Sequence, residues 1–469
     1  MRPTTDEIEP GRQETASQGT VTGRFEEWTQ GRLVSSLGTN SGAPKLPFQD
    51  WRHFKEAFAP ELVARAVAES KIPVKRCLDP FGGSGTTALA CQFLGVHPIT
   101  IEVNPFLADL IEAKLSHYDA DRLTRDFVDV VRSARRSSVE PAIRFDWLPP
   151  TFLEPGVSGR WIFDISVAQR ISALLQAIDS LANTLHRRLF RVLLGGILVS
   201  VSNVVVNGKG RRYRGGWKSR RCEPETVDKA FSDVVHRAII DLRSYSDRPW
   251  SGFELLRGDS RRLLRLGAPA DLAIFSPPYP NSFDYTDIYN VELWALGYLR
   301  SSQENTSLRN STLCSHVQLK REFPAAPQGS SALTSLTEQL RGLRKRLWSP
   351  WIPEMIGGYF YDLAGILRSI YKTLTPSGNV WIVVGDSRYS GIQVDTAEIL
   401  SELALDTGYE VESIEPFRSM RASAQQGGRP ELSESVVKLK KPNVAWRRRR
   451  GIALNSQTGT NASRRRPAR

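Results

Sequence analysis

The segment Asp271-Leu-Ala-Ile-Phe-Ser-Pro-Pro-Tyr279 joins a short apolar run to a rigid, polar end. The apolar part is typical of a buried parallel strand. Because neither proline donates a backbone hydrogen bond and both fix φ, we expect the Pro277 carbonyl to point outward as an acceptor beside the Ser276 hydroxyl. These two acceptors and the neighbouring Tyr279 ring suit a planar ring that carries an exocyclic NH₂ group. Taken alone, the tetrapeptide is more typical of an ordinary turn.

A second candidate is the glycine-rich turn Asp79-Pro-Phe-Gly-Gly-Ser-Gly-Thr-Thr87. Glycines let the backbone approach a ligand closely, and the helix expected to follow offers unpaired N–H groups. The turn has no lysine, so it is not a phosphate-binding P-loop, and Thr86-Thr-Ala after the last glycine departs from the dinucleotide pattern GxGxxG. A plain glycine turn is the remaining alternative.

Two acidic residues follow predicted strands. Glu102 ends the strand after the glycine turn, where an acid about 20 residues on can accept both ribose hydroxyls of a nucleoside cofactor. Asp259, in Gly258-Asp-Ser260, could accept from an adenine amino group. The alternative for Asp259 is an N-cap of the next helix.

The elements around these motifs alternate between strand and helix, which predicts an α/β fold with a seven-stranded, mostly parallel sheet and helices on both faces. Asn104-Pro105 is expected to cap and begin a helix, and Gly95 to end one. The expected strands are 76–79, 97–103, 253–256, 271–275, 379–384, 409–414 and 433–439. The expected helices are 54–71, 86–94, 105–118, 224–245, 260–266, 289–299, 358–374 and 394–407, with one or two more from 167 to 206.

Composition and rhythm divide the chain of 469 residues into five parts. The polar N-terminus and the basic C-terminus are predicted to be disordered. The most apolar run, Val192 to Val206, contains Ser200, Ser202 and Asn203, so a buried helix is expected there and not a membrane span. The predicted parts are a disordered segment 1–45, a cofactor half 46–118, an inserted helical and basic region 119–249, a catalytic half 250–440 with a loop insertion 300–350, and a disordered tail 441–469.

The charge balance predicts an anionic partner. Lys and Arg total 63 against 50 Asp and Glu, a net charge of +13, but ten of the basic residues lie after residue 439, where no acid occurs. The four cysteines lack metal-ligand spacing and the six histidines are scattered, so no metal is expected. The N-terminus lacks a secretory signal, and we expect reduced thiols in a cytoplasmic, nucleoid-associated protein without a membrane partner.

Both motifs together resemble the S-adenosylmethionine-dependent amino-methyltransferases that modify DNA at cytosine N4 or adenine N6. DPFGGSGTT at Asp79–Thr87 and SPPY at Ser276–Tyr279 carry the resemblance. Supporting segments are Phe54 to Leu62, Glu102 to Pro105, Tyr279 to Tyr285 and Thr375 to Gly378. The resemblance covers about 48–118 and 250–440 and implies a Rossmann-like class I methyltransferase fold.

The resemblance also implies roles for individual residues. S-adenosyl-L-methionine would be the cofactor, with its methionine part near Phe58 and the glycine turn, its ribose on Glu102 and its adenine on Asp259. The implied catalytic residues are Ser276, Pro277, Pro278 and Tyr279. The implied cofactor residues are Phe58, Asp79, Phe81, Gly83, Ser84, Gly85, Thr86, Glu102, Asn104 and Asp259.

A serine as first residue of the tetrapeptide favours cytosine N4 in this family, whereas aspartate favours adenine N6. The glycine turn precedes the tetrapeptide here, an order that many cytosine-N4 enzymes reverse, so motif order does not choose the base. An RNA base methyltransferase and a non-catalytic nucleic-acid-binding protein are the other hypotheses.

The inserted region is predicted to read the target sequence. Residues 208–221 contain seven basic residues, no acid and two aromatic rings. The predicted nucleic-acid contacts are Arg211, Arg212, Tyr213, Arg214, Trp217 and Lys218, with a solvated loop as the alternative. The basic tail is expected to add sequence-independent affinity, or simply to be a solubilising end. Double-stranded DNA is thus the expected partner, with a cognate restriction endonuclease as a further one.

Overall fold

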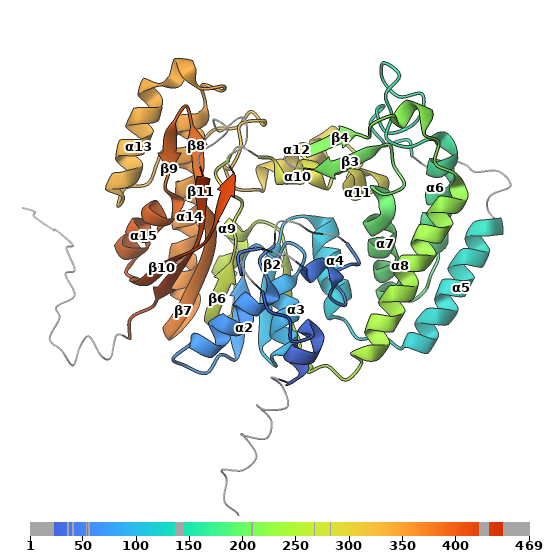
Figure 1. The fold of residues 1–469 in the computed structure, drawn as a ribbon, viewed down its shortest axis with the longest axis horizontal. Helices are drawn as coiled ribbons and strands as arrows, with labels where there is room; N and C mark the ends of the chain where they lie inside the picture. Colours follow the sequence, from blue (N-terminus) through green and yellow to red (C-terminus); the bar gives the residue numbers. More distant parts are fainter. Residues whose placement is uncertain are drawn as a thin grey trace, which may run out of the picture.

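A seven-stranded sheet forms the centre of the protein (Figure 1), seen here in a computed structural model that describes residues 23–34, 37–39, 42–52, 54, 57–136, 145–207, 210–266, 268–281, 283–421 and 431–443. The strand order is β10–β11–β7–β6–β1–β2–β5. Strand β11 runs antiparallel to both neighbours, and the other pairs are parallel. The strands are β1 (Arg76–Asp79), β2 (His97–Glu102), β5 (Glu254–Arg257), β6 (Ala270–Phe275), β7 (Leu374–Gly385), β10 (Glu410–Arg421) and β11 (Glu431–Lys440). The predicted mostly parallel seven-stranded sheet is confirmed.

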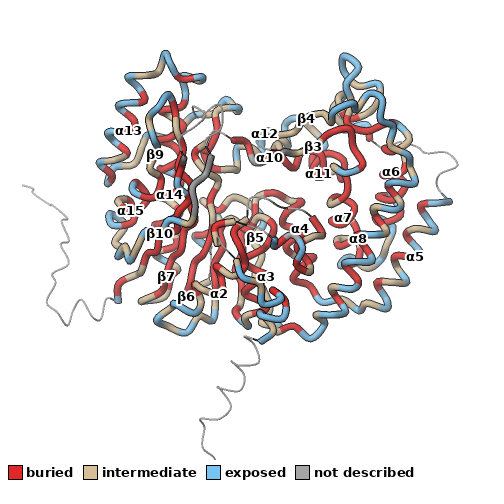
Figure 2. The backbone as a smooth tube through the Cα atoms, viewed as in Figure 1, coloured by how far each residue is buried: buried red, intermediate tan, exposed pale blue. Residues whose placement is uncertain are grey.

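Helices cover both faces of this sheet, and its central strands are buried between them, whereas the edge strands β5 and β10 are partly exposed (Figure 2). Side chains along a strand alternate between the two apolar cores: Cys77 joins one and Leu78 the other, as Ile274 and Phe275 do on β6. One face carries α2 (Pro60–Glu69), α3 (Thr86–Phe93) and α4 (Pro105–Leu115); the other carries α9 (Ser260–Leu263), α13 (Ser331–Gly342), α14 (Ile352–Thr373) and α15 (Thr396–Thr407). This burial on both faces explains the continuous apolar runs of the parallel strands.

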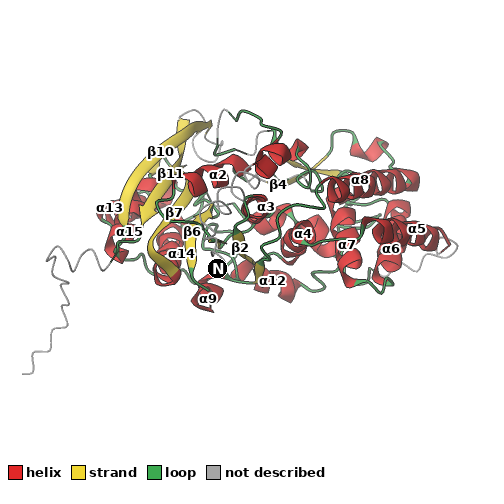
Figure 3. Cartoon of the chain, turned by 90° about the horizontal axis from the view of Figure 1, so that it is seen from below, coloured by secondary structure: helices red, strands yellow, loops and turns green. Residues whose placement is uncertain are grey.

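The inserted region forms a helical group at one end of the molecule, far from β10 (Figure 3). It contains α5 (Ala120–Arg136), α6 (Ile165–Asp179), α7 (Thr184–Leu198), α8 (Pro224–Ser244) and the antiparallel hairpin of β3 (Val204–Asn207) and β4 (Gly210–Tyr213). Helix α5 is absent from the sequence prediction, although Leu123, Phe127, Val130 and Ala134 show helical spacing and are buried. Within the described residues, no helix is long and apolar enough to cross a membrane.

The apolar run expected to be one helix up to Val206 is divided in two. Helix α7 ends at Leu198, and a turn rich in Ser and Asn leads into β3. The polar residues of the run therefore mark a boundary between a helix and a strand.

Part of the N-terminal segment predicted to lack order is folded, so that prediction is wrong for it. Residues 23–29 form a helix. Trp28 is fully buried, stacks on Phe93 at 4.6 Å between ring centroids and donates from Nε1 to the Pro47 carbonyl at 3.1 Å. Two aromatic side chains, Phe25 and Trp28, supply enough apolar surface to fix this short helix on the core. Residues 1–22 and the basic tail 444–469 lie outside the described residues.

The segment 300–350 is helical in part, contrary to the predicted loop. It contains α12 (Ser302–Asn310) and α13, each begun by a serine N-cap, Ser301 and Ser330. Helix α14 begins at Ile352, earlier than expected, and α2 begins later, at Pro60. Short elements near the pocket are α10 (Tyr285–Ile288), α11 (Asn290–Ala295), β8 (Ser387–Tyr389) and β9 (Ile392–Val394).

Candidate active site

The two predicted motifs lie at the same edge of the sheet and line one cavity of about 340 Å³. The glycine turn follows β1, Glu102 ends β2, Asp259 follows β5, and the tetrapeptide follows β6. Parallel strands bring their carboxyl ends to one edge, which explains why segments far apart in the chain meet there. The predicted residues that line the cavity are Phe58, Asp79, Phe81, Gly83, Ser84, Thr86, Glu102, Asn104, Asp259, Ser276, Pro277, Pro278 and Tyr279.

The glycine turn is closed by hydrogen bonds to the acids beside it. The N–H of Phe81 donates to Asp79 Oδ1 at 2.9 Å, and that of Gly83 donates to Glu102 Oε2 at 2.7 Å. Gly83 has φ +52°, and a Cβ there would lie 3.1 Å from the Phe54 ring. The positive φ therefore favours glycine at this position, and a side chain would also require the Phe54 ring to shift.

Gly85 is the one predicted cofactor residue that does not line the cavity. It is the N-cap of α3 with φ +80°, and a Cβ there would lie 3.0 Å from Ile111 Cγ1. The structure thus explains this glycine by packing and helix capping, and a direct cofactor contact through Gly85 stays a prediction.

Two buried carboxyl groups face the cavity. Burial raises the pKa of Glu102 to about 7 and that of Asp79 to about 6. Glu102 accepts from two backbone N–H groups, those of Gly83 and Asn104, each at 2.7 Å. Carboxyl groups held in this way can accept hydrogen bonds from hydroxyl groups of a ligand or pair with its positive charge.

Asn104 has the capping role that the sequence predicts. Its Oδ1 accepts from the N–H of Phe106 at 3.0 Å and of Leu107 at 3.3 Å, which begins α4. Because this oxygen is used by the helix, the side chain fixes the floor of the cavity, and a contact between Asn104 and a cofactor stays a prediction.

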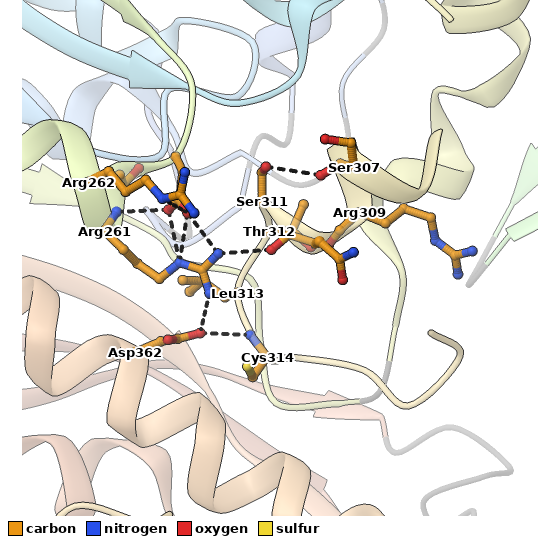
Figure 4. A network of polar contacts seen from close by, with 12 residues as sticks. Arg261, Arg262, Ser307, Arg309, Ser311, Thr312, Leu313, Cys314 and Asp362 are labelled. Atoms are coloured by element: carbon orange, nitrogen blue, oxygen red, sulfur yellow. Dashed lines mark hydrogen bonds and ion pairs between the residues drawn. The ribbon is translucent and has the colours of Figure 1, made fainter. Parts of the chain in front are cut away.

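Asp259 and Arg261 belong to a polar network that connects the start of α9 with α14 and with the segment around Cys314; Figure 4 shows Arg261, Asp362 and Cys314 within it. Asp259 caps α9 through the N–H of Arg261 at 2.9 Å and receives the Arg261 guanidinium on both oxygens. Arg261 also donates to Asp362 on α14 at 3.0 Å, and Asp362 accepts from the N–H of Cys314 at 3.0 Å. The predicted alternative of an N-cap at Asp259 is thus confirmed, while its carboxylate still lines the cavity.

The tetrapeptide shows a chain of hydroxyl groups that ends on an acid. The Ser276 hydroxyl donates to the Tyr279 oxygen at 3.3 Å, and the Tyr279 hydroxyl donates to Glu434 Oε1 at 2.8 Å. Glu434 lies on β11, is 3% exposed and lines the same cavity. The buried phenol of Tyr389 donates to the Pro280 carbonyl at 2.8 Å and fixes the end of this loop.

Several pocket residues could not be identified from the sequence. Glu434 falls within a strand that was predicted, but nothing local marks an acid there as part of a site. Gly38 lies in the segment predicted to lack order, and a Cβ on it would lie 2.8 Å from Glu434 Oε2. Phe54 and Tyr289 stack at 6.0 Å beside the glycine turn.

A buried lysine supports the glycine turn from behind. Lys114 on α4 donates to the Ser84 carbonyl at 2.8 Å and to Gln49 Oε1 at 3.1 Å. Burial lowers the pKa of its ammonium to about 7. Its place within an apolar helical pattern gave no sign of this contact in the sequence.

The predicted nucleic-acid residues lie on the β3–β4 hairpin and the turn after it, outside the cavity lining. Arg214 donates to the Ser202 carbonyl at 2.9 Å and the Val199 carbonyl at 2.7 Å, Arg211 lies over the Phe152 ring, and the rings of Tyr213 and Trp217 pack together at 4.8 Å. Arg212 and Lys218 are exposed. Most of this set therefore stabilises the insertion, and DNA contact by any of the six stays a prediction.

Among the described residues, no group of three or more His, Cys, Asp and Glu could hold a metal ion. The four cysteines, all described, are free thiols.

The strand order, the antiparallel β11 and the cavity at the carboxyl ends of β1 and β6 define a Rossmann-like class I methyltransferase fold, as expected. Comparison with known proteins then supports a narrower class: residues 14–113 match the family described as DNA methylase. The resemblance to the DNA amino-methyltransferases, which rests in the sequence on the two motifs, is confirmed at the level of the family.

Similar proteins include the type II methyltransferase M.AvaI of Nostoc, 28% identical over 444 residues that cover 88% of this chain and 89% of that protein. The type II methyltransferase M.BsoBI of Geobacillus stearothermophilus is 23% identical over 452 residues, 84% of this chain and 85% of that protein. Among solved structures, the glycopeptide N-methyltransferase MtfA complexed with S-adenosyl-L-methionine has 9% identity and a TM-score of 0.25, covering 82% of this chain and 93% of that one.

Proposed function

We propose that this protein transfers a methyl group from S-adenosylmethionine to the exocyclic amine of a base flipped out of duplex DNA, with cytosine N4 as the favoured target. One observation carries the proposal: the glycine turn with its two buried acids and the Ser276–Tyr279 tetrapeptide line a single cavity. The similarity to type II methyltransferases over most of both chains supports DNA as the substrate and a restriction-modification setting.

The residues of the cavity fit the cofactor. Glu102, with its raised pKa, would accept the ribose hydroxyls, and Asp79 together with the backbone of Phe81 and Gly83 would surround the methionine part. Asp259 would border the adenine as an acceptor whose position Arg261 fixes. When bound, S-adenosylmethionine supplies an electrophilic methyl group on a positively charged sulfur.

The tetrapeptide would make the amine reactive by holding its two N–H bonds. The lone pair of an aromatic amine is delocalised into the ring, so the free base is a poor nucleophile. Acceptors at Ser276 Oγ and the Pro277 carbonyl would favour a tetrahedral nitrogen whose lone pair faces the methyl group. The Tyr279 ring would stack on the base, which must leave the duplex to reach the cavity.

Glu434 would set the direction of the hydroxyl chain. Because the Tyr279 hydroxyl donates to this carboxylate, its oxygen accepts the Ser276 proton, and Ser276 Oγ keeps its lone pairs for the amine. When the N–CH₃ bond forms and the S–CH₃ bond breaks, the nitrogen must lose one proton. The same chain offers that proton a path away from the base.

The choice of cytosine rests on Ser276 as the first residue of the tetrapeptide, and adenine N6 is the second candidate. The test incubates the purified protein with methyl-labelled S-adenosylmethionine and with duplex DNA or RNA, followed by nucleoside analysis. Label in N4-methylcytosine from DNA is expected. Label in N6-methyladenine would correct the base, label only in RNA would correct the substrate, and no label in either would contradict the proposal.

A further inference from the structure

The turn between α13 and α14 forms a second basic and aromatic surface, at Arg341, Lys345, Arg346, Trp348 and Trp351. The segment Arg341-Gly-Leu-Arg-Lys-Arg-Leu-Trp-Ser-Pro-Trp351 contains no acid. Trp348 is 48% exposed and Trp351 58% exposed. The side chains of Arg341, Lys345 and Arg346 are exposed. Arg341 interacts electrostatically with Glu354, and Arg344 donates to the same carboxylate at 3.0 Å.

This surface contrasts with the β3–β4 hairpin, the segment that the sequence favours for DNA contact. On the hairpin, Tyr213 and Trp217 pack against each other and Arg214 is bound to backbone carbonyls. On the α13–α14 turn, the rings and the cations are both presented to solvent. Exposed tryptophans beside solvated cations suit a partner with negative charge and apolar edges.

The turn also lies at the same edge of the sheet as the residues that line the pocket. Helix α14 leads directly into β7 and runs back along the sheet, so its first residues lie at the end where β6 and β7 finish (Figure 1). Two hydrogen bonds connect the turn to the tetrapeptide loop through the β8–β9 hairpin. Ser390 Oγ donates to the Arg346 carbonyl at 3.0 Å, and the adjacent Tyr389 donates to the Pro280 carbonyl at 2.8 Å.

We propose that this α13–α14 surface binds the phosphate backbone of the duplex beside the flipped base. Helix α13 and the β3–β4 hairpin lie on opposite sides of the molecule (Figure 1). The inference rests on the proposed function and adds a partner surface to it. A base inside the cavity places the neighbouring phosphates along the rim, because each strand of a duplex carries one phosphate for about every 3.4 Å of helix axis. Arginine, lysine and tryptophan there would hold the backbone without reading sequence.

The test measures binding of a fluorescent duplex of about 30 base pairs as salt is varied, in the presence of S-adenosylmethionine. The variant Arg341→Ala/Lys345→Ala/Arg346→Ala is expected to bind about tenfold or more weakly, on duplexes of any sequence. Its slope of log affinity against log salt should be less steep by roughly 0.9 for each phosphate that the variant no longer neutralises. A charge-matched control, Arg122→Ala/Arg125→Ala/Arg136→Ala on the distant helix α5, should bind like the unchanged protein.

Further variants separate the possible outcomes. Arg341→Lys/Arg346→Lys keeps the charge and should keep most of the affinity, whereas Trp348→Ala/Trp351→Ala should lower it. The inference fails if the triple variant keeps its affinity and salt slope, or if the α5 control loses as much. It also fails if the tryptophan changes alter self-association in sedimentation but leave DNA affinity intact. If the unchanged protein neither binds nor methylates duplex DNA, the proposed function itself fails.

Discussion

The proposed cofactor side of the pocket comes mainly from one continuous stretch, residues 79–104, whereas the proposed base side is assembled from segments scattered over the chain. The tetrapeptide at 276–279 meets Gly38 near the N-terminus and Glu434 near the C-terminus. The first side depends on backbone conformation, with glycines at positive φ and acids that accept from N–H groups. The second depends on side chains that orient one another. Mutations should therefore affect cofactor binding and methyl transfer separately.

Loss of the tetrapeptide side chains should have the largest effect and should be confined to methyl transfer. We expect Ser276→Ala and Tyr279→Ala to lower kcat by about 10²–10³-fold, the loss typical of a removed transition-state contact. The affinity for S-adenosylmethionine, measured by calorimetry, should change little. Full activity of both variants would show that the amine is held elsewhere.

A mutation on the cofactor side should weaken cofactor binding and leave methyl transfer nearly unchanged. Glu102→Gln is expected to weaken S-adenosylmethionine binding by about tenfold or more, because hydrogen bonds to a charged acceptor are the strong ones. In such a variant, kcat at saturating cofactor should stay close to normal. If kcat fell while cofactor affinity held, the two sides would not be independent.

The same acid gives the binding a pH dependence with a definite sign. Burial raises the pKa of Glu102 to about 7, so below that pH the group increasingly carries a proton and accepts less well. Cofactor affinity, measured by calorimetry at each pH, should therefore fall as the pH drops from about 8 to about 6 and level off above about 8. Glu102→Gln should remove this step and leave the smaller one expected from Asp79, whose pKa is raised to about 6.

The variant Glu434→Gln tests whether the carboxylate at the end of the hydroxyl chain contributes to methyl transfer. The amide oxygen of glutamine can accept the hydrogen bond from the Tyr279 hydroxyl but cannot take up a proton. We therefore expect kcat to fall by about tenfold while the KM for the cofactor stays constant. Tyr279→Phe removes the same contact, and the double variant should be no worse than the poorer single one, because both break one chain. Additive losses would show that Glu434 acts independently of Tyr279.

The difference between the two sides also explains what the sequence could predict. Asp79, Gly83, Glu102 and Ser276 are found because each belongs to the end of a strand or the turn after it, and parallel strands bring such positions together. Glu434 and Trp28 could not be found, since their roles depend on which distant segments pack beside them. The hairpin shows a related limit: a run of Arg, Tyr and Trp has the same composition whether its side chains bind DNA or, as with Arg214, their own backbone.

Gly38 gives the smallest and most discriminating test of the base side. A Cβ there would lie 2.8 Å from Glu434 Oε2 and 2.8 Å from Phe417 Cδ2, so Gly38→Ala must displace these side chains or its own backbone. Overpacking of this kind costs about 1–3 kcal/mol. If part of that strain moves Glu434, kcat should fall by about three- to tenfold with cofactor affinity unchanged.

Gly23→Ala, where a Cβ meets nothing within 4 Å, is the matched control. A Gly38→Ala protein with a lower melting temperature but normal kcat would show that Phe417 moves instead, and that the carboxylate holds its place beside Tyr279.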